Sequence, residues 1–297
     1  MWPSGRGLSS TGKCRPRVAA HALYRDFFRF LEALTQSAAD PWAAYQQHYL
    51  SPHRQVLEAY WQQVIGLGEA EWRSRVQRVK PGDYAQLRSL VQSEDLSAIA
   101  DQAISLCRGL LPAEREPEVY YLIGFFSPEA FLLQLDARWE IAVGLERFHS
   151  LRRLPLYLCH EYAHWARRNC GWSGPESLAE RLASEGIAVV FTQQLLPDLP
   201  LHEHLFMHRS RFNAVQEARD RLWQEVGREL DSSAPEILQH YFAGVPGDSA
   251  LPPRAGLYLG YLAVEVFRHS HRDLSFGELI QVSGKAIFSE WSAAPTR

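Results

Sequence analysis

The sequence predicts an α+β fold that is mostly helical. Apolar residues recur at helical spacing over most of the 297 residues, whereas three short runs rich in β-branched and aromatic residues lie close together between Val119 and Leu145. The composition, with 46% hydrophobic and 22% charged residues, is that of a globular chain and not of a disordered one. We therefore expect one small sheet in the middle of the chain, with helices before and after it.

The first part of the chain predicts a tail followed by helices. Residues 1–20 are rich in Gly, Ser and Pro and lack the apolar centre of a signal peptide, so we expect a flexible tail there. From 21 to 112 the apolar spacing is helical, with one run from Leu23 to Leu34, one from Val56 to Ile65 and one near 96–111. This N-terminal helical region shows no chemistry. It is expected to support the rest of the fold, or alternatively to line one wall of a cleft with its aromatic residues.

After Pro112 the pattern changes to short strands. The runs 119–126, 131–135 and 139–145 are bounded by Pro, Ser and charged residues and alternate apolar with polar or smaller side chains. We expect them to form a small antiparallel sheet that precedes the next helix.

The segment His160-Glu161-Tyr162-Ala163-His164 lies in the helical run that follows this sheet. Four residues make about one helical turn, so both imidazoles project from one face and can hold a single metal ion. Glu161 lies one step around the helix and is placed to reach a water on that metal, as a general base does. With 12 histidines in 297 residues, this spacing arises by chance in roughly a few such chains per hundred. The motif therefore needs support from a further ligand.

A second helix is expected from Ser177 to Leu196. Ser173 can cap it with Glu176 three residues later, Pro175 fits the first turn, and Pro197 ends the run.

This second helix carries a carboxylate on its apolar stripe. Leu178, Leu182, Glu185 and Val189 follow one another at steps of four, three and four residues. A buried carboxylate needs a partner, and a divalent cation held by the two histidines would supply one. Glu185 is therefore the expected third ligand. Gly186 next to it would let this helix approach the first one closely.

Each of these residues also has an ordinary interpretation. The two histidines could be core or surface residues of a helix, and Glu185 could pair with Arg181 one turn earlier. Glu176 and Glu180 are possible substitutes as third ligand, although Glu176 is better used as a cap and Glu180 lies off the stripe. The motif, its helical context and the Glu-Gly on the next helix together favour metal binding.

The same residues resemble the gluzincin metallopeptidases. In that group the two histidines are followed by a glutamate ligand on the next helix, here Glu185 after twenty intervening residues. The segments 160–164, 183–188 and 256–261 are most similar to a bacterial family of predicted zinc-dependent proteases. The resemblance covers roughly 119–267. It implies a metallopeptidase-like catalytic domain at 113–297, whose sheet lies over the site and pairs its edge strand with an extended substrate. No Gly-x-Met-Glu-Asn segment is present, so aminopeptidase activity is not implied.

The chain after Glu185 is expected to be helical, with a long charged helix over 201–230, a short one over 236–242 and an apolar one over 256–269. Three histidines of the charged helix, His202, His204 and His208, are expected on the surface and not in a second metal site.

A metallopeptidase needs a donor for the oxyanion that forms during hydrolysis, and a later helix usually supplies it. Tyr258 and Tyr261 are the candidates, because they lie three residues apart on the apolar helix beside Gly256 and Gly260, which permit close packing. Two core aromatic residues are the alternative. Tyr241 and His240 are weaker options.

The ligand set predicts the chemistry. His160, His164 and Glu185 would hold one zinc ion and leave a fourth position open for water, as in catalytic zinc sites. Glu161 would take the proton of that water and pass it to the leaving amine, with Tyr258 or Tyr261 holding the oxyanion. The expected function is hydrolysis of peptide bonds in peptide or protein substrates. The alternatives are a zinc-stabilised helical interaction protein without turnover, and a helical structural protein with a coincidental motif.

Composition excludes several other classes. The chain has 31 basic and 34 acidic residues and no basic stripe, so neither nucleic acid nor an anionic membrane is an expected partner. No apolar run approaches the twenty residues of a transmembrane helix. Four scattered cysteines (Cys14, Cys107, Cys159 and Cys170) without a Cys-x-x-Cys pair suit a reducing cytoplasm. Cys159 points about 100° away from His160 on a helix and is expected as a buried thiol. The sequence shows no determinant of substrate preference or oligomeric state.

Overall fold

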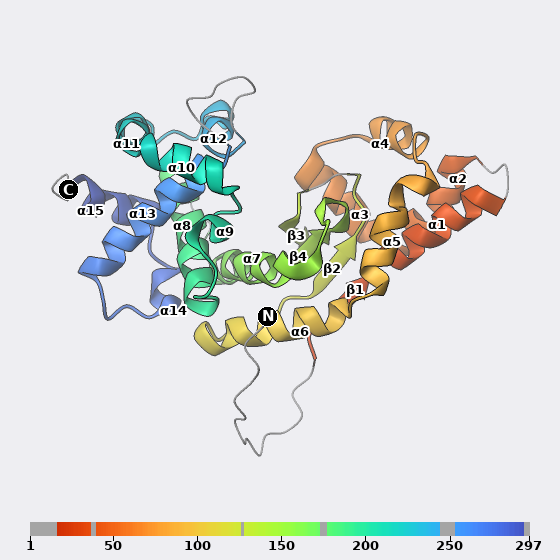
Figure 1. Cartoon of the computed structure of the whole chain (residues 1–297), viewed down its shortest axis with the longest axis horizontal. Coiled ribbons are helices and arrows are strands. Elements are labelled where there is room, and N and C mark those ends of the chain that lie inside the picture. The colour runs from red at the N-terminus through yellow and green to blue at the C-terminus, as the bar shows by residue number, and fades with distance from the viewer. Residues whose placement is uncertain (1–16, 37–39, 126–127, 173–176, 244–252, 294–297) are drawn as a thin grey trace, which may run out of the picture.

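A computed structural model of the chain describes residues 17–36, 40–125, 128–172, 177–243 and 253–293. Its fold is α+β and mostly helical, with one four-stranded sheet (Figure 1). Six α-helices precede the three central strands in the described chain, and the helices from α7 onward follow them. The predicted fold class is confirmed at this level.

The sheet is mixed, so the predicted antiparallel sheet is wrong. Its order is β1-β2-β4-β3, with β1 parallel to β2, β2 parallel to β4, and only β3 antiparallel to β4. The strands are β1 (Ala20–Ala22), β2 (Val119–Leu122), β3 (Ala130–Leu135) and β4 (Arg138–Gly144).

Connectivity explains the difference. A two-residue turn joins β3 to β4, and its first residue, Asp136, has a φ of 53°. The return strand β4 then lies between β3 and β2 and runs in the direction of β2. Strand β1 reaches β2 through the whole N-terminal helical region, and such a long crossover permits parallel pairing. The alternation of apolar and polar residues along a strand indicates which side chains share a face. It does not indicate whether the neighbouring strands run parallel or antiparallel.

The N-terminal region is helical as predicted, apart from β1. Its α-helices are α1 (Tyr24–Gln36), α2 (Pro41–Tyr45), α3 (Arg54–Tyr60), α4 (Glu69–Val76), α5 (Ala85–Gln92) and α6 (Leu96–Leu110). Two π-helical turns, Gln46–Leu50 and Trp61–Ile65, and two 3₁₀ turns, Ser51–His53 and Pro81–Tyr84, link them.

The aromatic residues of this region pack mainly on one another. The Phe27 ring lies 5.3 Å from that of Tyr49, and the Trp72 indole donates a hydrogen bond of 3.0 Å to the Tyr45 hydroxyl. The Tyr60 hydroxyl donates to the Gly124 carbonyl over 2.7 Å, which joins this core to the end of β2. These rings form a core that supports the sheet.

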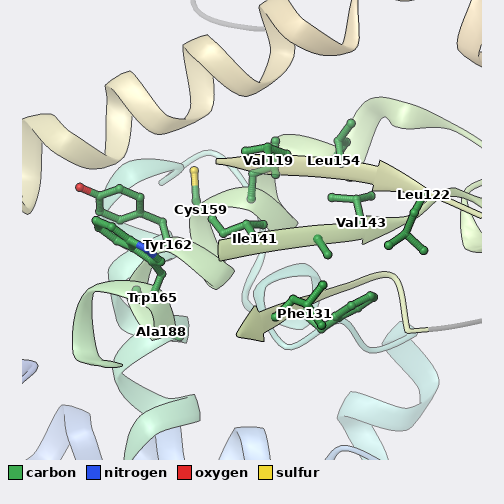
Figure 2. Packing of buried hydrophobic residues seen from close by; sticks show 14 of the residues in the cluster. Val119, Leu122, Phe131, Ile141, Val143, Leu154, Cys159, Tyr162, Trp165 and Ala188 are labelled. Atoms are coloured by element: carbon green, nitrogen blue, oxygen red, sulfur yellow. The ribbon is translucent and has the colours of Figure 1, made fainter. Parts of the chain in front are cut away.

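Helix α7 (Leu154–Asn169) packs against the sheet (Figure 2). Its residues Leu154 and Cys159 are fully buried close to Ile141 and Val143 of β4. The Cys159 thiol is buried as predicted and contacts the carbonyl of Ala103 on α6 at 3.9 Å.

Helix α8 (Leu178–Leu195) follows α7 and matches the predicted second helix. Its N-cap is Ser177, whose hydroxyl accepts a hydrogen bond of 3.3 Å from the Glu180 amide. The predicted cap by Ser173, Pro175 and Glu176 lies outside the described residues.

A buried ion pair joins α7 to α8. Arg167 is 1% exposed, and its Nη2 lies 3.1 Å from Oε2 of Glu180. Its Nη1 donates to the Ile280 carbonyl over 2.8 Å, and Oε1 of Glu180 accepts from the Gly284 amide over 2.8 Å. Glu180 therefore has a structural partner, and nothing in its surroundings supports it as a third metal ligand.

The C-terminal helices differ from the prediction in one place. They are α9 (Leu201–His204), α10 (Arg209–Glu217), α11 (Arg219–Gly227), α12 (Pro235–Phe242), α13 (Ala255–Ser270), α14 (Phe276–Leu279) and α15 (Gly284–Ala293). The long helix expected over 201–230 is wrong, because Phe206 has a φ of 51° and His208 caps a new helix at α10. Within the described ranges, no helix combines the length and apolarity that a membrane span requires.

Glycines bring α8 into direct backbone contact with α13. A Cβ atom on Gly260 would overlap the Leu182 carbonyl, and one on Gly186 would overlap the carbonyl of Gly260. The expectation that Gly186 lets α8 approach α7 is therefore wrong, since this glycine faces the opposite neighbour. The close packing expected at Gly260 is confirmed.

We predict that Gly260→Ala lowers the free energy of unfolding by about 3 kcal/mol, because the added methyl group meets backbone and cannot be accommodated by a side-chain movement. Urea unfolding followed by circular dichroism measures this. The control is Gly109→Ala on α6, where a Cβ would meet nothing within 4 Å; it should gain up to about 1 kcal/mol. Equal effects of the two substitutions would contradict the backbone contact.

His204 is buried, which contradicts its predicted surface position. It is 0% exposed on α9, and its Nδ1 lies 2.9 Å from the Thr192 hydroxyl of α8. That hydroxyl donates to the Val189 carbonyl, so it accepts the Nδ1 proton. The short helix α9 folds back onto α8, which its charged sequence does not reveal. Burial lowers the pKa of His204 to about 4.

This burial predicts a pH-dependent stability. Between the ordinary histidine pKa and about 4 the unfolded chain binds a proton that the folded chain excludes, so stability falls as the pH falls through this window, by about 3 kcal/mol in total. His204→Gln should remove that part of the loss in urea unfolding measured from pH 7 to pH 4. His202→Gln, which removes a partly exposed imidazole from the same helix, serves as the control. An unchanged pH dependence in His204→Gln would refute the assignment.

Candidate metal centre

Helices α7 and α8 bring three ligand atoms together. His160 and His164 project from one face of α7, and Glu185 faces them from α8. The two Nε2 atoms are 3.1 Å apart, and Oε2 of Glu185 lies 3.2 Å from Nε2 of His160 and 3.6 Å from Nε2 of His164. The predicted ligand set is therefore a spatial cluster.

These separations fit a tetrahedral metal ion. Bonds of about 2.0–2.1 Å from zinc to nitrogen and oxygen place two ligands of a tetrahedron about 3.3 Å apart. In the described part of the chain, these three side chains are the only group of at least three His, Cys, Asp or Glu residues that could share an ion. No fourth side chain of these types closes the site there.

A hydrogen bond orients the His164 imidazole, and packing orients that of His160. Nδ1 of His164 lies 3.1 Å from the Ser184 hydroxyl, which accepts its proton when Nε2 is a ligand. The His160 ring is 4% exposed and packs edge-on against Phe206 at 4.9 Å. Nδ1 of His160 is buried and has no hydrogen-bond partner among the described residues.

The cluster is electrostatically coupled. Burial alone would raise the pKa of Glu185, but the two imidazoles lower it well below its ordinary value. Burial works to lower the pKa of His164, yet the Glu185 carboxylate outweighs it and the net shift is upward. The carboxylate is thus held ionised, as a metal ligand must be.

Arg181 is not the partner of Glu185. Its guanidinium stacks on the Phe242 ring at 4.7 Å, and Glu185 contacts the two histidines instead. The ordinary interpretation of Glu185 as one half of a helical ion pair is thereby excluded for these described residues.

Glu161 lies beside the ligands without joining them. It is 8% exposed, and no described residue makes a hydrogen bond or ion pair to its carboxylate in this structure. Burial raises its pKa to about 7. A carboxylate in this position can accept a proton near neutral pH.

A cavity of about 520 Å³ opens onto the cluster. Strand β3 contributes Ala130, Phe131 and Leu132, and α7 and α8 contribute the three ligands and Glu161. The remaining lining comprises Pro128, Glu129, Trp139, Tyr157, Arg167, Arg168, Trp172, Arg181, Ser184, Phe206, Phe242, Arg254 and Leu257. No described residue between 17 and 125 lines this cavity, so the aromatic residues of the N-terminal region do not form its wall.

The two tyrosines expected as oxyanion donors are not among the residues that line the cavity. Tyr258 is 5% exposed, with its ring edge-on to Phe212 and 6.5 Å from that of Tyr261. The Tyr261 hydroxyl interacts with Gln193 of α8. Helix α13 presents Leu257 to the cavity instead. Both tyrosines thus occupy packing positions between helices.

Tyr157 and Arg254 are two further polar side chains in the lining of the cavity. Tyr157 lies on α7 three residues before His160, and its ring stacks on Phe206 at 4.3 Å. Arg254 precedes α13 with a φ of 70°, donates to the Phe206 carbonyl over 2.8 Å and pairs with Glu129 at 3.3 Å. Helical spacing from His160 could have pointed to Tyr157, whereas no sequence signal marks Arg254.

Comparisons of the chain with protein-family models, with curated proteins and with solved structures find no match. The interpretation of the site therefore stands on its own geometry.

We predict that Glu185→Ala abolishes stoichiometric zinc binding, because two imidazoles alone leave the ion without its charged ligand. Ser184→Ala should weaken zinc binding by about 10- to 100-fold, since the serine hydroxyl orients His164. Titration calorimetry of the metal-stripped protein measures both affinities. Glu217→Ala, which removes an exposed carboxylate from α10, should bind zinc like the wild type. Wild-type affinity in Glu185→Ala would exclude this metal centre.

Proposed function

We propose that this protein hydrolyses peptide bonds with one zinc ion held by His160, His164 and Glu185. The observation that carries the proposal is the convergence of three ligand atoms, 3.1–3.6 Å apart, on a cavity that also contains an unpaired buried carboxylate. Two histidines and one glutamate form a donor set of catalytic zinc sites, whereas closed structural sites use four protein ligands. The cavity and the three-membered group favour turnover over a zinc-stabilised interaction protein.

Glu161 is the proposed general base and acid. A zinc ion held by these three residues would supply a Lewis acid for the substrate carbonyl and would lower the pKa of water to about 7. Glu161 then accepts the proton of the attacking water and delivers it to the leaving amine. Its burial and its freedom from partners among the described residues support this assignment.

Tyr157 and Arg254 are the proposed donors to the oxyanion. Both line the cavity, and both carry N–H or O–H groups that can point at a carbonyl oxygen. Arg254 is held in place by Glu129 and by the Phe206 carbonyl, which fixes a donor before the substrate arrives. They replace Tyr258 and Tyr261 in this role.

The edge of β3 supports a peptide substrate. The amide of Gly144 donates to the Glu129 carbonyl, and the register places Phe131 opposite Ala142. In an antiparallel pair the bonded residues alternate, so Ala130 and Leu132 direct their backbone N–H and C=O groups away from β4. Both residues line the cavity. An extended peptide can pair with these groups whatever its sequence.

The proposed activity is also the one that the resemblance to gluzincin peptidases implies. The ligand spacing, the glutamate on the next helix and the cavity beside an edge strand are consistent with that group. The mixed order of the sheet is a property of this chain and does not affect the edge that β3 presents.

We predict that Glu161→Gln keeps zinc bound at wild-type affinity while peptide hydrolysis falls by about 10²- to 10⁴-fold, the usual contribution of a general base. Mass spectrometry of a mixed peptide library, incubated with the zinc-loaded proteins, measures the cleavage rates. Glu236→Gln, an exposed glutamate of α12, is the matched control and should cleave like the wild type. Retained cleavage in Glu161→Gln would refute the role of Glu161, and no cleavage by the zinc-loaded wild type would refute the proposed function.

A further inference from the structure

Two arginines lie at the same end of the cavity, one helical turn beyond the metal ligands. Arg168 follows His164 by four residues on α7, and Arg181 precedes Glu185 by four residues on α8. The contacts between α7 and α8 pair later residues of one helix with earlier residues of the other, so the helices run antiparallel. We call Arg168 and Arg181 the arginine end of the cavity.

Aromatic rings hold both guanidinium groups. Arg168 lies over Trp139 at 5.0 Å and over Trp172 at 5.2 Å, and Arg181 lies over Phe242 at 4.7 Å. An aromatic face supports a planar guanidinium and leaves the N–H groups at its edge available for hydrogen bonds. All three rings line the same cavity. The Arg181 guanidinium is thus a positioned donor on the wall of the cavity.

Two arginines of the cavity, Arg167 and Arg254, pair with carboxylates of the described residues. Arg167 is buried against Glu180, and Arg254 is paired with Glu129. No described carboxylate forms an ion pair with Arg181, although its guanidinium lines the cavity. Its N–H groups are therefore candidates for hydrogen bonds to a bound ligand.

The cavity is lined by more basic than acidic side chains, whereas the chain as a whole is slightly acidic. The chain has a net charge of −3, yet four arginines and no lysine line this cavity. Three glutamates also line it, namely Glu129, which pairs with Arg254, Glu161, and Glu185 of the ligand cluster. With a divalent ion bound, the positive charge of the cavity favours a ligand that carries negative charge.

The distance from the metal ligands to the arginine end indicates where on a substrate the negative charge would lie. Four helical residues rise about 6 Å, and an extended peptide advances about 3.3 Å per residue. The arginine end therefore lies about two substrate residues from the bond that is cleaved. A carboxylate matches the fork of N–H groups on a guanidinium and can accept two hydrogen bonds from it.

We propose that the cavity selects peptides that carry a carboxylate within about two residues of the scissile bond, and that Arg181 binds this carboxylate. The proposal rests on the proposed peptidase function and narrows its substrate class. The carboxylate can come from an Asp or Glu side chain or from the C-terminus of a short peptide.

Binding tests the proposal without requiring turnover. The probes are acetylated alanine-based hexapeptides with Glu or Gln at each position in turn, each made with a free or an amidated C-terminus, and titrated into the zinc-loaded Glu161→Gln protein. Peptides with the preferred carboxylate should bind about 10- to 100-fold more tightly than their uncharged counterparts, as expected for hydrogen bonds to a charged group. The Glu series reports a side-chain carboxylate, and the free C-terminus reports a terminal one.

Variants at Arg181 identify its role. Arg181→Gln in the same background should remove the preference and leave binding of uncharged peptides unchanged, and Arg181→Glu should reverse it in favour of peptides with Lys. Arg211→Gln, an exposed arginine of α10, should keep the preference. Equal binding of charged and uncharged peptides, or an unchanged preference in Arg181→Gln, would overturn the proposal. Since cleavage by the wild type is measured separately, either result leaves the peptidase assignment intact.

Discussion

The buried ion pair between Arg167 and Glu180 is the interaction on which the arrangement of the site depends. It joins α7 to α8, and Nη1 of Arg167 and Oε1 of Glu180 bond to Ile280 and Gly284, so both helices are tied to the C-terminal part of the fold. A buried pair adds little stability over well-packed apolar residues, but removal of one partner leaves an uncompensated charge that costs about 3–5 kcal/mol. Its main effect is on register. One pair determines which residues of α7 face which residues of α8, and so places Glu185 opposite two imidazoles.

Helix α8 has two neighbours that set its position in different ways. Toward α7 it presents Glu185, and toward α13 it presents Gly186, where backbones touch without intervening side chains. Glu185 thus belongs to the ligand cluster, whereas the next residue, Gly186, makes the close backbone contact with α13. Backbone contact tolerates little movement, because protein interiors are close-packed. The distance between the carboxylate and the imidazoles is therefore fixed by the core of the domain and not by flexible loops.

The sequence predicts the local parts of this molecule well and the long-range parts poorly. His160, His164 and Glu185 were found because spacing within a helix is a local property, and the strands at 119–122, 130–135 and 138–144 were found because alternation is local too. The direction of β2, the burial of His204 and the approach of Arg254 depend on contacts between segments far apart in the chain, which periodicity does not contain. Tyr258 and Tyr261 were chosen for their chemistry on an apolar helix. The side of that helix that faces the cavity belongs to Leu257 instead.

The side chain of Gln63 has a consequence for the outer edge of β3. Its amide donates to the Gln134 carbonyl over 2.8 Å and accepts from the Gln134 N–H over 2.9 Å, so it completes the ladder at the far end of β3 as a neighbouring strand would. An open strand edge is a template on which further chains can assemble into aggregates. Capped in this way, β3 leaves only Ala130 and Leu132 unsatisfied along its outer edge, a stretch too short to nucleate a fibril. The outer edge of β3 is therefore open beside the cavity and closed by Gln63 beyond it.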